Sequence, residues 1–126
     1  MIKFVDFISR AKAETLEDQD NLAIISVSEP KVDPALLALP ESRILRLSFH
    51  DIDPGNEDVS FWKLFDEEQA RSIIDFVDQL HAASRQFELM VHCRAGISRS
   101  AAIALYVANA TGCRFPRRPF AGLANR

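Results

Sequence analysis

The sequence lacks several features that would place it in a specialised class of protein. No apolar run reaches the roughly 18 residues that a membrane-spanning helix requires. Lys and Arg number 15 against 18 Asp and Glu, a formal net charge of −3, so composition gives no reason to expect nucleic acid or an anionic membrane as a partner. The three histidines are accompanied by no second cluster of metal ligands, so we expect no metal site.

Cysteine is scarce as well, and the two that are present, Cys93 and Cys113, are not expected to be bridged. If residues 99–110 are helical, a rise of about 1.5 Å per residue separates the two cysteines by more than the roughly 7 Å Cα limit of a disulfide. Free thiols fit a reducing compartment. The segment Met1–Asp6 has an acidic residue inside its apolar stretch, which argues against a signal peptide. We therefore expect a cytoplasmic protein.

What the sequence does contain is an alternation of strand-like and helix-like segments. At 126 residues, 48% of them hydrophobic, the chain is long enough for a single compact domain over 1–126 with a modest core. Apolar patterns predict strands at 2–8, 22–27, 44–49 and 87–91, and helices from Ser9 to about Asp18, from Asp66 onward and over 99–110. This alternation predicts an α/β fold with a mostly parallel central sheet flanked by helices. The helix from Asp66 is expected to bury Ala70, Ile73, Ile74, Val77 and Leu80.

The most informative stretch runs from Val91 to Ser100, between a predicted strand and an apolar helix. A loop that opens a helix points several main-chain N–H groups in one direction, with the positive end of the helix dipole behind them, and so binds a tetrahedral anion. A cysteine in such a place ionises more readily than usual, which makes Cys93 a candidate nucleophile. Arg99 offers a planar fork that can bind two phosphate oxygens. The stretch therefore combines a nucleophile with a phosphate site.

This stretch resembles the signature loop of the cysteine-dependent protein tyrosine phosphatases, and most of all their dual-specificity branch. The residue types match at five positions: His92, Cys93, Gly96, Arg99 and Ser100. The similarity is sharp over about residues 88–107 and holds only as a pattern over 43–87. It implies a phosphatase-type phosphate-binding loop between a central strand and a buried helix. It also implies hydrolysis of phosphate monoesters through a cysteinyl-phosphate intermediate, without a cofactor.

The resemblance also assigns roles to the residues of the loop. Cys93 is the nucleophile, Arg99 holds the phosphate, and Ser100 stabilises the thiolate as it leaves in the second step. His92 is expected to hold the loop through a hydrogen bond. The phosphate is bound by the main chain of Arg94, Ala95, Gly96, Ile97, Ser98 and Arg99. The Arg94 side chain points either to solvent or to a second acidic group on the substrate.

A general acid has to protonate the leaving oxygen, and a positioned carboxylic acid typically contributes a factor of about 10²–10⁴. In the resembling family this acid is an Asp on a loop that follows a strand upstream of the signature. Asp51 follows the predicted strand most directly and is the first candidate. Asp53 and Asp58 are the alternatives in the same polar loop.

The implied substrate is phosphotyrosine on a protein, with phosphoserine and phosphothreonine as further candidates, or a small aryl phosphate. Lipid phosphates are less favoured because the loop has no lysine, and RNA 5′-triphosphates because the chain is acidic. Only 26 residues follow Ser100, so the C-terminal helices usual in the family are shortened, and either a monomer or a homodimer is compatible with this. The alternative function is a non-catalytic phosphopeptide-binding module. A redox or sulfur-transfer protein is a third reading.

Overall fold

The computed structural model describes residues 1–29, 32–48, 67–94 and 98–121. They form a four-stranded sheet in the order β1-β4-β2-β3, and every neighbouring pair is parallel. This confirms the predicted α/β fold with a parallel sheet packed against helices. The elements in chain order are β1 (Ile2–Ser9), α1 (Arg10–Ala13), β2 (Leu22–Ser28), the 3₁₀ turn η1 (Glu41–Arg43), β3 (Ile44–Ser48), α2 (Glu67–Ala82), β4 (Phe87–Cys93), α3 (Ser98–Thr111) and α4 (Arg118–Ala121).

The two central strands are β2 and β4, and β2 is buried on both faces of the sheet. All residues of β2 from Leu22 to Val27 are buried, Ser26 included. Strands covered on both faces are expected to read as continuous apolar runs, which is the pattern that the sequence shows here. Because β4 is central, its carboxyl end at Cys93 lies between the ends of β1 and β2, opposite Ser9 on the β1 side. Ligands of open parallel sheets bind at this edge.

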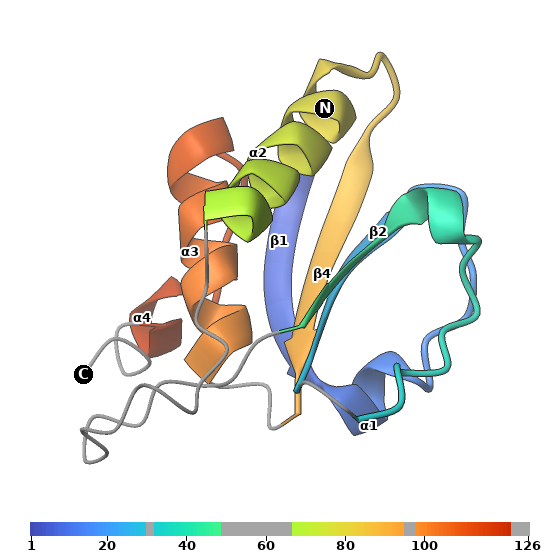
Figure 1. Ribbon diagram of the computed structural model, residues 1–126. Coiled ribbons are helices and arrows are strands. Elements are labelled where there is room, and N and C mark those ends of the chain that lie inside the picture. The colour runs from blue at the N-terminus through green and yellow to red at the C-terminus, as the bar shows by residue number, and fades with distance from the viewer. Residues whose placement is uncertain (30–31, 49–66, 95–97, 122–126) are drawn as a thin grey trace.

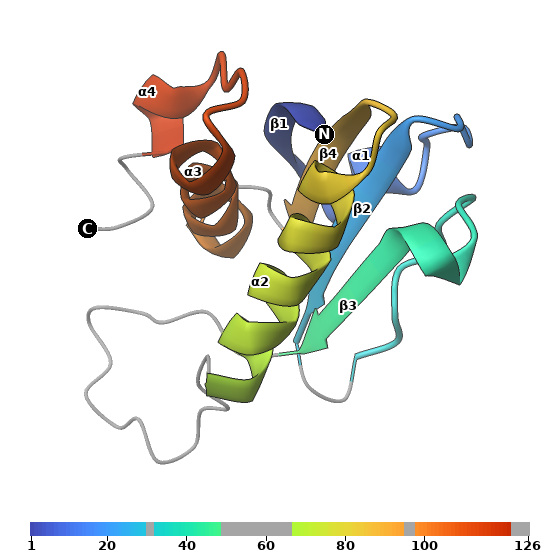
Figure 2. The same cartoon turned by 90° about the horizontal axis from the view of Figure 1, so that it is seen from above.

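Helices α2 and α3 lie on the same face of the sheet (Figures 1 and 2). They contribute Ile73, Val77 and Leu80 from α2 and the apolar residues of α3 to the main core, against alternate residues of the strands. The predicted buried stripe of α2 is wrong at Ile74, which is 42% exposed. Phe76 packs against the core instead. The face that α2 buries is therefore rotated slightly from the one that the spacing predicts.

The crossover between β2 and β3 covers the opposite face, and α1 lies at the carboxyl ends of β1 and β4 (Figure 1). A second apolar cluster of Leu22, Ile24, Leu39 and Ile44 fills that side. The predicted helix over 9–18 is wrong in length, since α1 ends at Ala13. Beyond Ala13, the segment that leads to β2 forms hydrogen bonds with the crossover and with Arg43.

Three tertiary hydrogen bonds explain where α1 stops. The Glu14 carboxylate accepts a hydrogen bond of 2.8 Å from the Leu36 main-chain N–H, so it bonds to the crossover. The Arg43 guanidinium donates to the Leu22 carbonyl at 2.8 Å and to the Asp18 carboxylate at 2.7 Å. These tertiary contacts stabilise an irregular segment between α1 and β2, where local propensity alone would allow the helix to continue.

The C-terminal segment returns to the outer edge of β1. Gly112, with φ of 71°, ends α3 in the left-handed conformation that favours glycine, and its N–H donates to the Ala108 carbonyl at 2.8 Å. The main chain of Arg114 then bonds to Val5 (2.9 Å) and to Lys3 (3.0 Å). The main chain at Arg114 therefore pairs with part of the outer edge of β1. No helix within the described ranges is both long enough and apolar enough to span a bilayer.

Candidate active site

The predicted site lies where β4 ends and α3 begins. Cys93 is the last residue of β4 and is 2% exposed, on the face that packs against α2 and α3. The helix begins at Ser98, so the positive end of its dipole lies a few residues beyond the thiol. Arg94 follows Cys93 and is exposed. The strand and the helix predicted around the signature are thus both present.

Cys93 and Ser100 are brought together by this arrangement. The Cys93 Sγ and the Ser100 Oγ are 3.2 Å apart, and both side chains are buried. Ser100 lies in the first turn of α3, and α3 packs against β4, which ends at Cys93. A hydroxyl at this distance can donate a hydrogen bond to a sulfur that bears negative charge. The Ser100 hydroxyl can therefore stabilise a Cys93 thiolate, both when the thiolate attacks and when it leaves.

Arg99 is a buried cation, with only 8% of its surface exposed. Its Nη2 lies 3.8 Å from Oε1 of Glu29, a residue that follows β2. A buried guanidinium is costly unless negative charge or acceptors lie close to it, and the Glu29 carboxylate supplies some of that compensation. The sequence alone gives no sign of Glu29, because its proximity to Arg99 depends on β2 being the neighbour of β4.

His92 faces the other side of the sheet and bonds to Ser26. The two residues are directly opposite each other on β4 and β2, and His92 Nε2 is 2.6 Å from Ser26 Oγ. Both side chains are fully buried. Burial lowers the pKa of His92 below its usual value, and an interaction with the main chain of Cys93 opposes that shift. Burial therefore favours the neutral form of the ring beside the strand end that carries the thiol.

Ser26 is a second residue that the sequence reasoning missed. It is a polar residue within an otherwise apolar run, which is a usable signal for a buried hydrogen bond. Its partner could not be named without the register that pairs Ser26 with His92.

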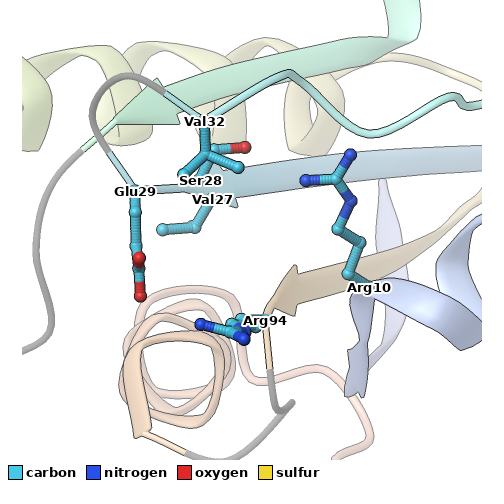
Figure 3. A pocket seen from close by; sticks show the side chains of 6 residues that line it. All are labelled: Arg10, Val27, Ser28, Glu29, Val32 and Arg94. Atoms are coloured by element: carbon cyan, nitrogen blue, oxygen red, sulfur yellow. The ribbon is translucent and has the colours of Figure 1, made fainter.

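An open cleft of about 330 Å³ lies at this edge of the sheet, and Figure 3 shows the residues around it. It is lined by Arg10, Val27, Ser28, Glu29, Val32 and Arg94. The Glu29 carboxylate and the Arg94 side chain extend toward the same side of the cleft, next to the ribbon of α3 (Figure 3). The side chain of Arg94 thus faces a cleft as well as solvent.

On the other side of the cleft, the side chain of Arg10 is fixed. Its guanidinium donates to the carbonyls of Asp33 (2.8 Å) and Pro34 (3.2 Å), and its Nε lies 3.6 Å from the Glu14 carboxylate. Its main-chain N–H donates to the Arg94 carbonyl at 3.3 Å. Arg10 therefore connects the crossover, α1 and the start of the signature loop.

Several predicted site residues lie outside the described residues. These are the main-chain phosphate-binding candidates Ala95, Gly96 and Ile97 and the three candidate acids Asp51, Asp53 and Asp58. Ser98 is described as the first residue of α3. Within the described ranges, no group of three or more His, Cys, Asp or Glu side chains is arranged to hold a metal ion.

Comparison with known proteins assigns no family to this chain. The sequence matches no protein-family model, and no curated protein is significantly similar to it. What is established is a parallel four-stranded α/β fold in which Cys93 Sγ, at the carboxyl end of a central strand, lies 3.2 Å from Ser100 Oγ in the first turn of α3.

Proposed function

We propose that the protein hydrolyses phosphate monoesters through a cysteinyl-phosphate intermediate. The observation that carries this proposal is the buried contact of 3.2 Å between Cys93 Sγ and Ser100 Oγ at the start of α3. A thiol that served only as a small core side chain would need no hydroxyl beside it and no buried guanidinium six residues on. The resemblance of the signature to that of the dual-specificity phosphatases favours phosphotyrosine on proteins as the substrate.

In the first step the Cys93 thiolate attacks phosphorus, and an S–P bond forms as the bond to the leaving oxygen breaks. The Arg99 guanidinium and the main-chain amides of residues 94–99 hold the three equatorial oxygens, where negative charge is concentrated. The leaving oxygen takes a proton from a carboxylic acid, for which Asp51 is the first candidate and Asp53 and Asp58 are the others.

In the second step water attacks phosphorus, and the S–P bond breaks. The same carboxylate accepts a proton from the water, and inorganic phosphate is released. The Ser100 hydroxyl donates a hydrogen bond to the departing Cys93 thiolate, for which its distance of 3.2 Å from the sulfur is suitable. Ser100 should therefore matter most for the breakdown of the intermediate.

To test the proposal, the steady-state rate of para-nitrophenyl phosphate hydrolysis is measured at about pH 6. Cys93→Ser should lose all measurable turnover, whereas Cys113→Ser, which changes the other free cysteine outside this site, should retain it. Orthovanadate should inhibit the wild-type protein. Replacing the general acid by Asn should lower kcat by about 100-fold or more, and testing Asp51, Asp53 and Asp58 in turn identifies it.

Two results would contradict the proposal. Turnover that survives Cys93→Ser would exclude the covalent route through this thiol. A folded wild-type protein that binds phosphopeptides but releases no phosphate would instead favour the non-catalytic binding module.

A further inference from the structure

The Glu29 carboxylate is an unusual neighbour for a phosphate site. It lies 3.8 Å from the guanidinium of Arg99, and it lines the cleft together with Arg94, the residue that follows Cys93. A side chain that carries negative charge is thus placed beside the cation expected to bind the negatively charged phosphate.

The local environment partly shields this ion pair from solvent. Arg99 is almost completely buried, while the Glu29 side chain is 34% exposed, so the pair lies at the boundary between protein and solvent. Charges at such a boundary are screened less than charges on an open surface. The negative charge of Glu29 therefore acts on Arg99, and on any anion that binds to Arg99.

The position of the carboxylate also favours an effect on ligands. Glu29 follows the carboxyl end of β2, and it enters the cleft from the side opposite to α3 (Figure 3). The first turn of α3, which includes Arg99 and Ser100, offers the positive end of a helix dipole to anions. A carboxylate close to this end lowers the positive electrostatic potential that would attract a phosphate.

We propose that Glu29 is a resident counter-ion of the phosphate site. It compensates the charge of Arg99 when the site is empty and repels the phosphate when the site is filled. This inference rests on the proposed function only in assuming that Arg99 binds phosphate. It explains how a site with a buried arginine and a helix N-terminus can still release its inorganic phosphate product: the carboxylate weakens the binding of free anions.

The experiment compares wild type with Glu29→Gln, which removes the charge and keeps the shape. The affinity for inorganic phosphate is measured by titration calorimetry, without any substrate. Removing one negative charge from beside the anion should tighten phosphate binding about tenfold at low ionic strength. The difference between the two proteins should shrink as salt is added, because added ions screen the charge. Glu29→Asp, which keeps the charge, should remain closer to wild type than Glu29→Gln does.

The control is Glu41→Gln. Glu41 carries the same charge and also pairs with an arginine, Arg46 at 3.0 Å, but its side chain is 71% exposed and it does not line the cleft. Its substitution should leave phosphate affinity unchanged. Thermal melting of each variant shows that the proteins compared are folded.

An unchanged or weaker phosphate affinity in Glu29→Gln would overturn the inference, and a weaker one would show that Glu29 helps Arg99 to bind. The proposed function fails in a different way. If Glu29→Gln binds phosphate more tightly but neither protein hydrolyses para-nitrophenyl phosphate, the counter-ion role stands and the enzymatic activity does not. If both proteins turn over substrate with equal phosphate affinity, only the counter-ion role is lost.

Discussion

The imidazole of His92 makes the fold sensitive to mild acid. Burial lowers the pKa of this ring, so the unfolded chain, in which histidine titrates near about 6.5, binds a proton more readily than the folded protein does. The contribution of His92 to stability is therefore complete above about pH 6.5 and is lost as the pH falls toward the lower pKa of the folded state.

We expect the free energy of unfolding to fall by at most about 1.4 kcal/mol per pH unit below that point because of this residue. Urea unfolding of wild type and His92→Gln across this pH range measures it. The variant loses the hydrogen bond to Ser26 and is less stable at neutral pH, but its stability should depend less on pH. Equal slopes for the two proteins would show that His92 is not the group that titrates.

Some residues of the candidate site can be predicted from the sequence, and others cannot. Cys93, Arg99 and Ser100 lie within eight consecutive residues, so a local motif is enough to single them out, and the structure shows Cys93 and Ser100 in contact. Ser26 and Glu29 are more than 60 residues away from their partners in the chain, and only the order of the strands makes them neighbours. Nothing in a local pattern specifies that order.

At the scale of the elements, the end of α3 depends on one glycine. Gly112 has φ of 71°, and a Cβ added there would meet no atom within 4 Å, so a substitution costs backbone strain and no clash. Gly112→Ala should lower the free energy of unfolding by about 1 kcal/mol. Gly112→Asn should cost less, because asparagine tolerates the left-handed conformation better. Denaturant unfolding of the two variants is the measurement, and equal losses would argue against backbone strain as the cause.

The sequence predicts the four strands better than it predicts the helix after Ser9, for a physical reason. The four strands lie close to their predicted ranges because buried strands require uninterrupted or alternating apolar residues. The helix after Ser9 was predicted too long because tertiary bonds from Glu14 and Arg43 hold the following residues in an irregular path. Such bonds join positions that lie about 20 residues or more apart in the chain, beyond the reach of helical periodicity.

At the scale of the whole molecule, the main apolar core lies between the sheet and the two helices on one of its faces. Leu89 lies in the middle of β4, is 0% exposed and belongs to the main core. Leu89→Ala should lower the free energy of unfolding by about 2–5 kcal/mol. Leu36→Ala is the matched control, since this leucine is 81% exposed in the crossover, and its effect should stay within about 0.5 kcal/mol.

Chemical denaturation of both leucine variants checks the prediction. Similar losses for the two would mean that the packing of the crossover against the sheet contributes more than burial indicates. A large loss for Leu89→Ala alone would agree with a molecule in which the parallel sheet is the cooperative unit.

The pairing of β1 has a consequence for how the chain folds during its synthesis. Among the described residues, the main-chain partners of β1 in the sheet are β4, which begins at Phe87, and Arg114 near the other end of the chain. During synthesis β1 is therefore made well before β4 and cannot pair with it until β4 has left the ribosome. Contacts of such long sequence separation form slowly, and until they form the apolar side chains of Val5 and Phe7 stay exposed.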